Sequence, residues 1–188
     1  GGEGEVSREI APARLAELLD RQDIADCLTR FTRGIDRFDR ALFLSAYHDD
    51  AVIDAGDLVG SAAKVYDLAR DLHDEGQSAT MHNVLNHSCE LDGDTAHAET
   101  YFLFAGRNRD DTNWVAGGRY LDRFERRGGA WKIAFRRTII EWSGIVPTAE
   151  LPLGNAPDKD ATGVPQRGKG DPSYARPLVN MRVVGGRE

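Results

Sequence analysis

Asp36 and His82 are the two residues whose types and positions best suit acid–base chemistry. Asp36 lies at the end of a helical pattern, and His82 lies near the start of a segment in which polar and apolar residues alternate. A carboxylate that accepts a hydrogen bond from an imidazole holds one ring tautomer and makes the ring a stronger base near neutral pH. Either residue alone is more often structural, so the chemistry depends on the elements that would bring the two together.

Three helices are expected before residue 80. From Pro12 to Ile35 apolar residues recur at steps of three and four, which predicts an amphipathic helix covering a core; they include Leu15, Leu18, Leu19, Ala25, Leu28 and Phe31. A shorter helical pattern covers residues 38–47. The third helix should begin at an N-cap, Ser61, and run to about His73, with an apolar face formed by Ala62, Val65, Ala69 and Leu72.

Alternating polarity then predicts four strands separated by turn residues, with glycine hairpin turns at residues 92–94 and 127–129. The strands are expected at Met81–Leu91, Thr95–Gly106, Trp114–Arg126 and Ala130–Trp142, with a shorter strand at Ala51–Asp54. The order predicts an α+β fold, in which a curved antiparallel sheet wraps around the N-terminal helices. Gly117 and Gly118 lie inside a predicted strand, where a bulge or bend is the expected reason for them.

A sheet curled around the first helix would direct alternate side chains into one cavity. The expected inward set is His82, Val84, Asn86, Tyr101, Leu103, Trp114, Ala116, Tyr120 and Arg136. This lining is mostly apolar with a few polar groups, as is typical of a small-molecule pocket. The outward set would include Phe102, Phe104, Leu121 and Phe135, and such an apolar outer face predicts a homo-oligomer.

Composition restricts the partners and the number of domains. The 188 residues suit one domain at 11–146, between a disordered or expression-derived stretch at 1–10 and an extended tail at 147–188. The end of this tail, from Leu178 to Val184, could pack on the body or on a neighbouring subunit. A formal charge of −7 disfavours nucleic-acid and anionic-membrane partners.

Cysteine and histidine spacing argues against disulfides and metals. Cys27 and Cys89 are far apart, which suggests a reducing, cytoplasmic setting. His82 and His87 are five residues apart in a strand and should face opposite sides, so no metal site is expected. No cofactor is expected either.

Several stretches together resemble the SnoaL-like branch of the NTF2-like superfamily, in particular its hexachlorocyclohexane dehydrochlorinase and bile-acid dehydratase type, and more distantly scytalone dehydratase. They lie at residues 23–36, 47–51, 81–83 and 117–133. The resemblance implies an NTF2-like cone and, by matching positions, a catalytic dyad of Asp36 and His82. It also implies that Arg136 stabilises a departing anion.

One position departs from that pattern. Phe31 stands where the relatives have a lysine or tyrosine, so the usual partner of the leaving group is missing. Tyr101 could replace it if it points inward. Phe31, Val84, Leu103, Trp114 and Tyr120 are then expected to bind the substrate.

The preferred interpretation is a cofactor-independent lyase acting on a small hydrophobic or aromatic substrate, by dehydration, a related elimination or retro-aldol cleavage. One alternative is an isomerase or cyclase on a polyketide-like or steroid-like ring. Another is a small-molecule binding module without chemistry. By resemblance, the expected oligomer is a trimer.

Overall fold

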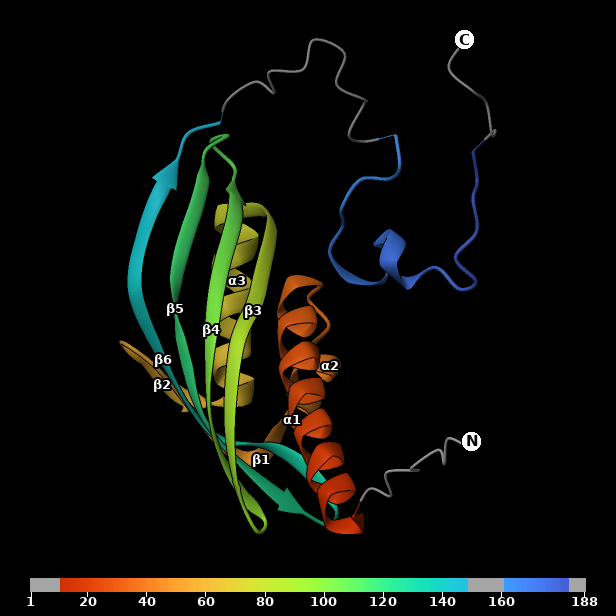
Figure 1. The fold of residues 1–188 in the computed structure, drawn as a ribbon. Helices are drawn as coiled ribbons and strands as arrows, with labels where there is room; N and C mark the ends of the chain where they lie inside the picture. The colour runs from red at the N-terminus through yellow and green to blue at the C-terminus, as the bar shows by residue number, and fades with distance from the viewer. Residues whose placement is uncertain (1–10, 149–160, 183–188) are drawn as a thin grey trace, which may run out of the picture.

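The computed structural model describes residues 11–148 and 161–182 (Figure 1). The predicted stretch at 1–10 lies outside the described residues. The helices and strands, in chain order, are α1 (Pro12–Asp36), α2 (Arg40–Ser45), β1 (Tyr47–Ala55), β2 (Leu58–Ser61), α3 (Ala62–Gly76), β3 (Gln77–Asp92), β4 (Thr95–Asn108), β5 (Asn113–Arg127) and β6 (Ala130–Val146). Two 3-10 turns follow, at Gly168–Gly170 and Pro172–Tyr174. The α+β class and the order of elements are confirmed; β2 was not predicted.

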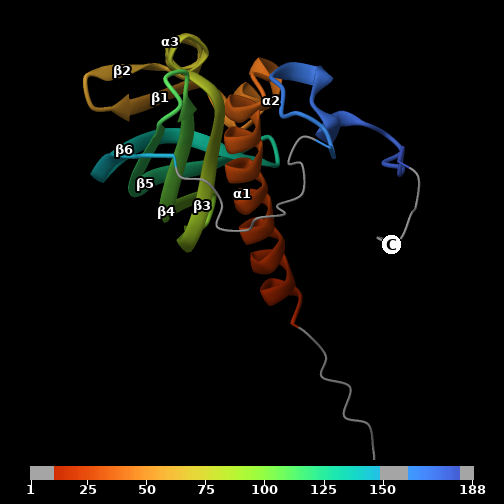
Figure 2. The same cartoon turned by 90° about the horizontal axis from the view of Figure 1, so that it is seen from above.

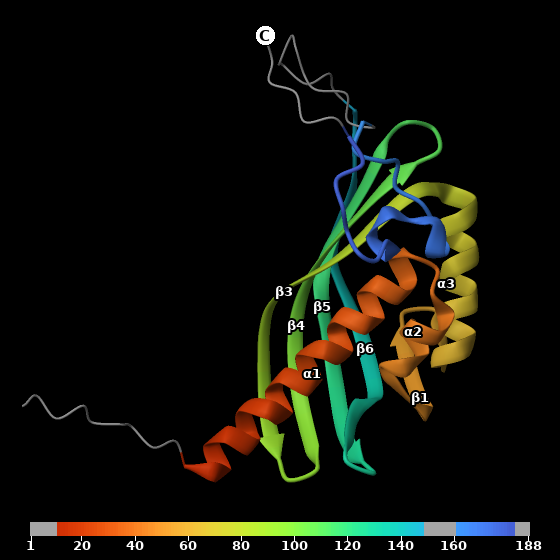
Figure 3. The ribbon, with the colours of Figure 1, turned by 90° about the vertical axis from the view of Figure 1, so that its right-hand side faces the viewer.

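One six-stranded sheet holds all the strands of the described residues, in the order β2-β1-β6-β5-β4-β3. Its long meander from β3 to β6 is antiparallel, whereas β1 pairs with β6 in parallel. The sheet is curved, and α1 and α3 cover its concave face (Figures 1 and 3). This arrangement is the expected cone, with its core between the helices and the concave face.

The long helix α1 buries its apolar residues against the sheet in its C-terminal half. Ile24, Cys27 and Ile35 are almost fully buried there. Leu15, Leu18 and Leu19, which we expected to face the core, are instead exposed, because the first turns of α1 extend beyond the edge of the sheet (Figure 2). None of the helices in residues 11–148 and 161–182 combines the length and apolar character needed to cross a bilayer.

A bulge in β3 decides which side chains of β4 point inward. Before the bulge Val84 pairs with Phe102, and after it His87 pairs with Thr100. Three residue steps on β3 therefore match two on β4, so β3 contains one extra residue. His82 therefore lies opposite Phe104. The prediction for β4 was wrong in consequence: Phe102 and Phe104 are buried, whereas Tyr101 and Leu103 lie on the outer face.

Gly118 marks a second irregularity, where the pairing of β5 with β6 shifts register between Gly117 and Gly118. The predicted bulge is thus confirmed. A Cβ atom on Gly118 would overlap the carbonyl oxygen of Ile139 on the neighbouring strand. Glycine is required here because two backbones come together more closely than any side chain allows.

We expect Gly118→Ala to lower the free energy of unfolding by about 2 kcal/mol or more, because one strand must move to accommodate the methyl group. Urea denaturation measures this loss. Gly144→Ala is the matched control, since a Cβ atom there meets nothing within 4 Å. Equal stability of the two variants would contradict this account of the bulge.

Candidate functional site

Asp36 and His82 meet at the end of α1. The carboxylate oxygen Oδ1 of Asp36 lies 2.7 Å from Nδ1 of the His82 ring, and Oδ2 accepts a hydrogen bond of 2.9 Å from the backbone N–H of His82. Two bonds to one residue fix the plane of the carboxylate. The side chains are only 12% and 14% exposed, so the pair is largely shielded from water.

A cavity of about 150 Å³ opens beside His82. Its lining comes from helices and strands on all sides of the core: Phe31, Ile35, Phe43, Tyr47, Ile53, Ala55, Val65, Ala69, His73, His82, Tyr120, Arg136 and Thr138. We call this cavity the chamber. Phe104 packs edge-on against the His82 ring with centroids 4.8 Å apart. The chamber is mostly apolar, with hydroxyl, imidazole and guanidinium groups at a few points.

Arg136 is 1% exposed and forms a two-pronged ion pair with Asp122, with both N–O distances 2.7 Å. Its guanidinium lies over the rings of both Phe31 and Tyr120, at 4.1 and 4.2 Å from their centroids. Burial is the largest single influence and opposes the charge, but the field and hydrogen bonds of Asp122, together with the nearby Tyr47 and Tyr120, outweigh it and raise the pKa of Arg136. Arg136 therefore keeps its charge, and most of that charge is balanced by Asp122.

Tyr47 is a chamber residue that the sequence analysis missed. Its hydroxyl oxygen accepts a hydrogen bond of 3.1 Å from Nη1 of Arg136. Burial raises the pKa of Tyr47, so the hydroxyl stays protonated. Because the oxygen accepts from Arg136, its own hydrogen remains available to a molecule in the chamber.

The remaining predicted site residues fall into three groups. Phe31 and Tyr120 line the chamber. Trp114 packs edge-on against Phe104, and Val84 faces inward beside Phe102, but neither lines the chamber. Tyr101 is 43% exposed on the outer face, and Leu103 lies on that face as well, so neither can reach the dyad.

His73, near the end of α3, is a second chamber histidine that the sequence analysis missed. Its ring lies 5.4 Å from the ring of His82, centroid to centroid, and its Nδ1 lies 2.7 Å from Oε1 of Gln77. Burial, followed by the proximity of His82, lowers the pKa of His73 to about 4. The sequence pattern could have indicated His73, because this residue continues the face of Val65 and Ala69 at helical spacing. The prediction that Leu72 lies on that face was wrong, since Leu72 is 66% exposed.

A C-terminal segment, residues 165–174, lies against the end of α1 (Figure 3). Nη1 of Arg167 donates to the backbone oxygen of Asp36 at 2.7 Å and to the hydroxyl of Thr80 at 2.6 Å. An ion pair of 2.8 Å between Arg37 and Asp171 holds the segment in place. Farther along, Leu178 is 81% exposed, so the tail does not pack back on the body there.

The predicted opposition of His82 and His87 was wrong, because the β3 bulge turns His87 inward. His87 lies 2.8 Å from the hydroxyl of Thr100 and forms no contact with the dyad. Within residues 11–148 and 161–182, no three histidine, cysteine, aspartate or glutamate side chains are grouped to hold a metal ion.

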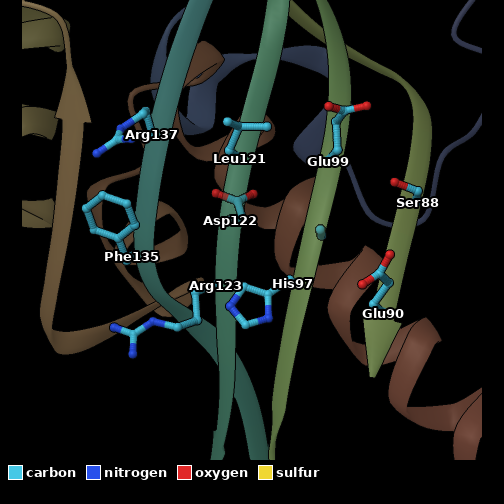
Figure 4. Close-up of a pocket in the computed structure, with 10 residues that line it drawn as sticks. Ser88, Glu90, His97, Glu99, Leu121, Asp122, Arg123, Phe135 and Arg137 are labelled. Carbon is cyan, nitrogen blue, oxygen red and sulfur yellow. The ribbon is translucent and has the colours of Figure 1, made fainter. Parts of the chain in front are cut away.

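A second hollow, of about 420 Å³, lies on the outer face of the sheet (Figure 4). Leu121 and Phe135 form its apolar part, as predicted for outward side chains. Acidic residues lie on the β3–β4 side, and Arg123 and Arg137 lie on the β5–β6 side. Neither Asp36 nor His82 lines this hollow, so it is separate from the dyad.

The profile of the SnoaL-like domain family matches residues 16–137. Among solved structures, a type 2 hexachlorocyclohexane dehydrochlorinase (LinA) has a TM-score of 0.66 at 21% identity, over 77% of this chain and 98% of the other. The type 3 enzyme from Novosphingobium barchaimii has a TM-score of 0.65 at 19% identity, over 77% of this chain and 99% of the other. A candidate scytalone dehydratase from Novosphingobium aromaticivorans has a TM-score of 0.62 at 16% identity, over 75% of this chain and 97% of the other. The comparison with curated proteins found no match.

The low pKa of His73 has a consequence for stability. Since the unfolded ring titrates near 6.5 and the folded ring near 4, the free energy of unfolding should fall as the pH drops through this interval and level off below it. His73→Asn should reduce the loss between pH 7 and pH 5 by about 2 kcal/mol. Urea denaturation at both pH values measures it, with the exposed His97→Asn as control. An unchanged slope in His73→Asn would contradict the assignment.

Proposed function

The chain belongs to the SnoaL-like domain family, and on this premise we propose that it is a cofactor-independent lyase in which the Asp36–His82 dyad removes a proton from a small hydrophobic or aromatic substrate. The observation that carries this proposal is the two-point bond between the Asp36 carboxylate and His82 in a site shielded from water. The family profile covers both residues, but the same fold serves many functions. The proposal therefore rests on the site.

The dyad geometry suits a general base. The carboxylate of Asp36 can only accept a hydrogen bond, so Nδ1 of His82 must donate and Nε2 carries the lone pair. A proton taken by Nε2 forms an imidazolium whose charge lies 2.7 Å from the carboxylate. Water competes weakly for this charge because the surroundings are apolar.

The departing group needs a hydrogen-bond donor, and Tyr101 cannot serve because it lies on the outer face. We assign this role to the hydroxyl of Tyr47, supported by the charge of Arg136 behind it. When His82 takes the proton, the electrons of the broken bond form the new double bond and the leaving group departs with its own pair. Tyr47 then stabilises the negative charge that develops on the leaving atom.

The size of the chamber favours a small substrate. An apolar cavity of about 150 Å³ holds a single benzene ring. A steroid-like ring system would have to displace the wall or extend through the opening. Isomerisation of a smaller ring uses the same base, and an unchanged product mass would identify it, whereas dehydration removes one water and retro-aldol cleavage gives two fragments.

We expect Asp36→Asn and His82→Ala each to lower turnover by about 10²–10⁴-fold, because one loses the orienting carboxylate and the other the base. A panel of small alcohols, halides and aromatic compounds, followed by mass spectrometry, supplies the assay. Asp71→Asn on the exposed face of α3 is the matched control. Wild-type rates in both dyad variants would refute the mechanism, and ligand binding without any turnover by the wild type would favour a binding module.

We also propose that a second copy covers the outer face. Its apolar residues, Leu121 and Phe135, lie beside the arginines on β5 and β6, and the acidic residues lie on β3 and β4 (Figure 4). The acidic side of one copy can therefore meet the basic side of the next around a closed ring. The trimer expected from resemblance satisfies this arrangement.

Light scattering should give an oligomer for the wild type and a smaller mass for Phe135→Glu, because a buried unpaired carboxylate is costly in an interface. Leu72→Glu on α3 is the control, as Leu72 is already exposed. A monomeric wild-type protein would contradict the proposal.

A further inference from the structure

His73 enters the chamber with only one ring nitrogen bonded to the protein. Its ring stacks on Phe104, with centroids 5.4 Å apart, and meets the ring of His82 edge-on. Nδ1 lies 2.7 Å from Gln77. The other nitrogen, Nε2, has no hydrogen-bond partner within the described part of the chain. Whether Nε2 can accept or donate depends on which nitrogen carries the proton.

A chain of hydrogen bonds with one possible direction decides the tautomer. It begins at the carboxylate of Asp110, whose pKa is lowered by hydrogen bonds from the Thr112 hydroxyl and backbone. An ionised carboxylate only accepts, so the Thr112 hydroxyl must donate to it, at 2.6 Å. The Thr112 oxygen then accepts from the amide nitrogen of Asn108, at 2.9 Å.

The same logic continues to the histidine. With its nitrogen donating to Thr112, Asn108 presents its oxygen to Nε2 of Gln77, at 3.3 Å. Gln77 must therefore turn its own oxygen to His73, and an amide oxygen accepts only. Nδ1 of His73 is consequently the donor. Because burial keeps the ring neutral, Nε2 carries a lone pair and no hydrogen.

His82 reaches the same state by a different route, since Asp36 holds its Nδ1 as a donor. The chamber thus contains two neighbouring imidazoles, each with a bare Nε2. Two acceptors cannot bond to each other. A molecule in the chamber must supply the hydrogens.

We propose that His73 determines substrate specificity by accepting a hydrogen bond from a hydroxyl group of the substrate, so that the substrate is an alcohol or phenol and not a halogenated hydrocarbon. This inference rests on the proposed function, because it treats the bound molecule as a substrate. The binding preference that it describes does not itself require turnover. A hydroxylated molecule satisfies Nε2 of His73, whereas a halogen of similar size leaves it unpaired in an apolar chamber.

Binding of two probes of nearly equal size tests this preference. Phenol should bind the wild type at least about tenfold more tightly than chlorobenzene, measured by calorimetry. In His73→Phe the affinity for phenol should fall about tenfold while that for chlorobenzene stays similar. In His82→Ala the preference should persist. Equal affinities in the wild type, or a preference lost only in His82→Ala, would overturn the inference.

Nitrogen NMR of the full wild-type chain at neutral pH gives a second test that needs no variant. The shifts should show Nδ1 of His73 protonated and Nε2 unprotonated. A proton on Nε2 would overturn the inference and leave the dyad untouched. Conversely, normal turnover in Asp36→Asn and His82→Ala with an intact phenol preference would refute the lyase mechanism and leave His73 as the acceptor.

Discussion

Exclusion of water from the concave face of the sheet governs how this protein uses polar residues. A buried charge or hydrogen-bonding group is costly unless the protein supplies its partner. Arg136 is paired with Asp122, and His82 with Asp36, each at 2.7 Å. Within the described residues, Nη2 of Arg167 is the one fully buried side-chain polar atom without a partner, and its guanidinium stacks on Phe38. These two ion pairs are therefore in place before any ligand arrives.

The sequence was sufficient for the elements but not for every face of the sheet. Periodicity located the helices and the meander, and the glycine turns at residues 92–94 and 127–129 correctly separated β3 from β4 and β5 from β6. The error on β4 has one cause. Without the extra residue between Val84 and His87, His82 would lie opposite Ala105, and Tyr101 would point inward as predicted. A one-residue slip exchanges the two faces of a strand, and nothing in the composition of β3 marks where its bulge falls.

The sequence also predicted only part of the candidate site. Asp36 and His82 could be identified because their residue types and positions are informative alone, whereas Tyr47, His73 and Asp122 become meaningful only through their neighbours. Asp122 is two residues beyond Tyr120 and shares its face, so strand alternation could have found it. The direction of the hydrogen bonds that end at His73 could not be predicted, because it depends on contacts between α3, the start of β3, the end of β4 and the loop after it.

The neighbouring His82 also helps to keep His73 neutral. Their rings lie 5.4 Å apart, and the proximity of His82 contributes to the low pKa of His73. Of the two, only His82 has a carboxylate of the described residues within hydrogen-bond distance. A proton released in the chamber therefore has one favourable destination, while His73 stays neutral and continues to accept a hydrogen bond. Two like side chains obtain different roles because one partner is a charged carboxylate and the other a neutral amide.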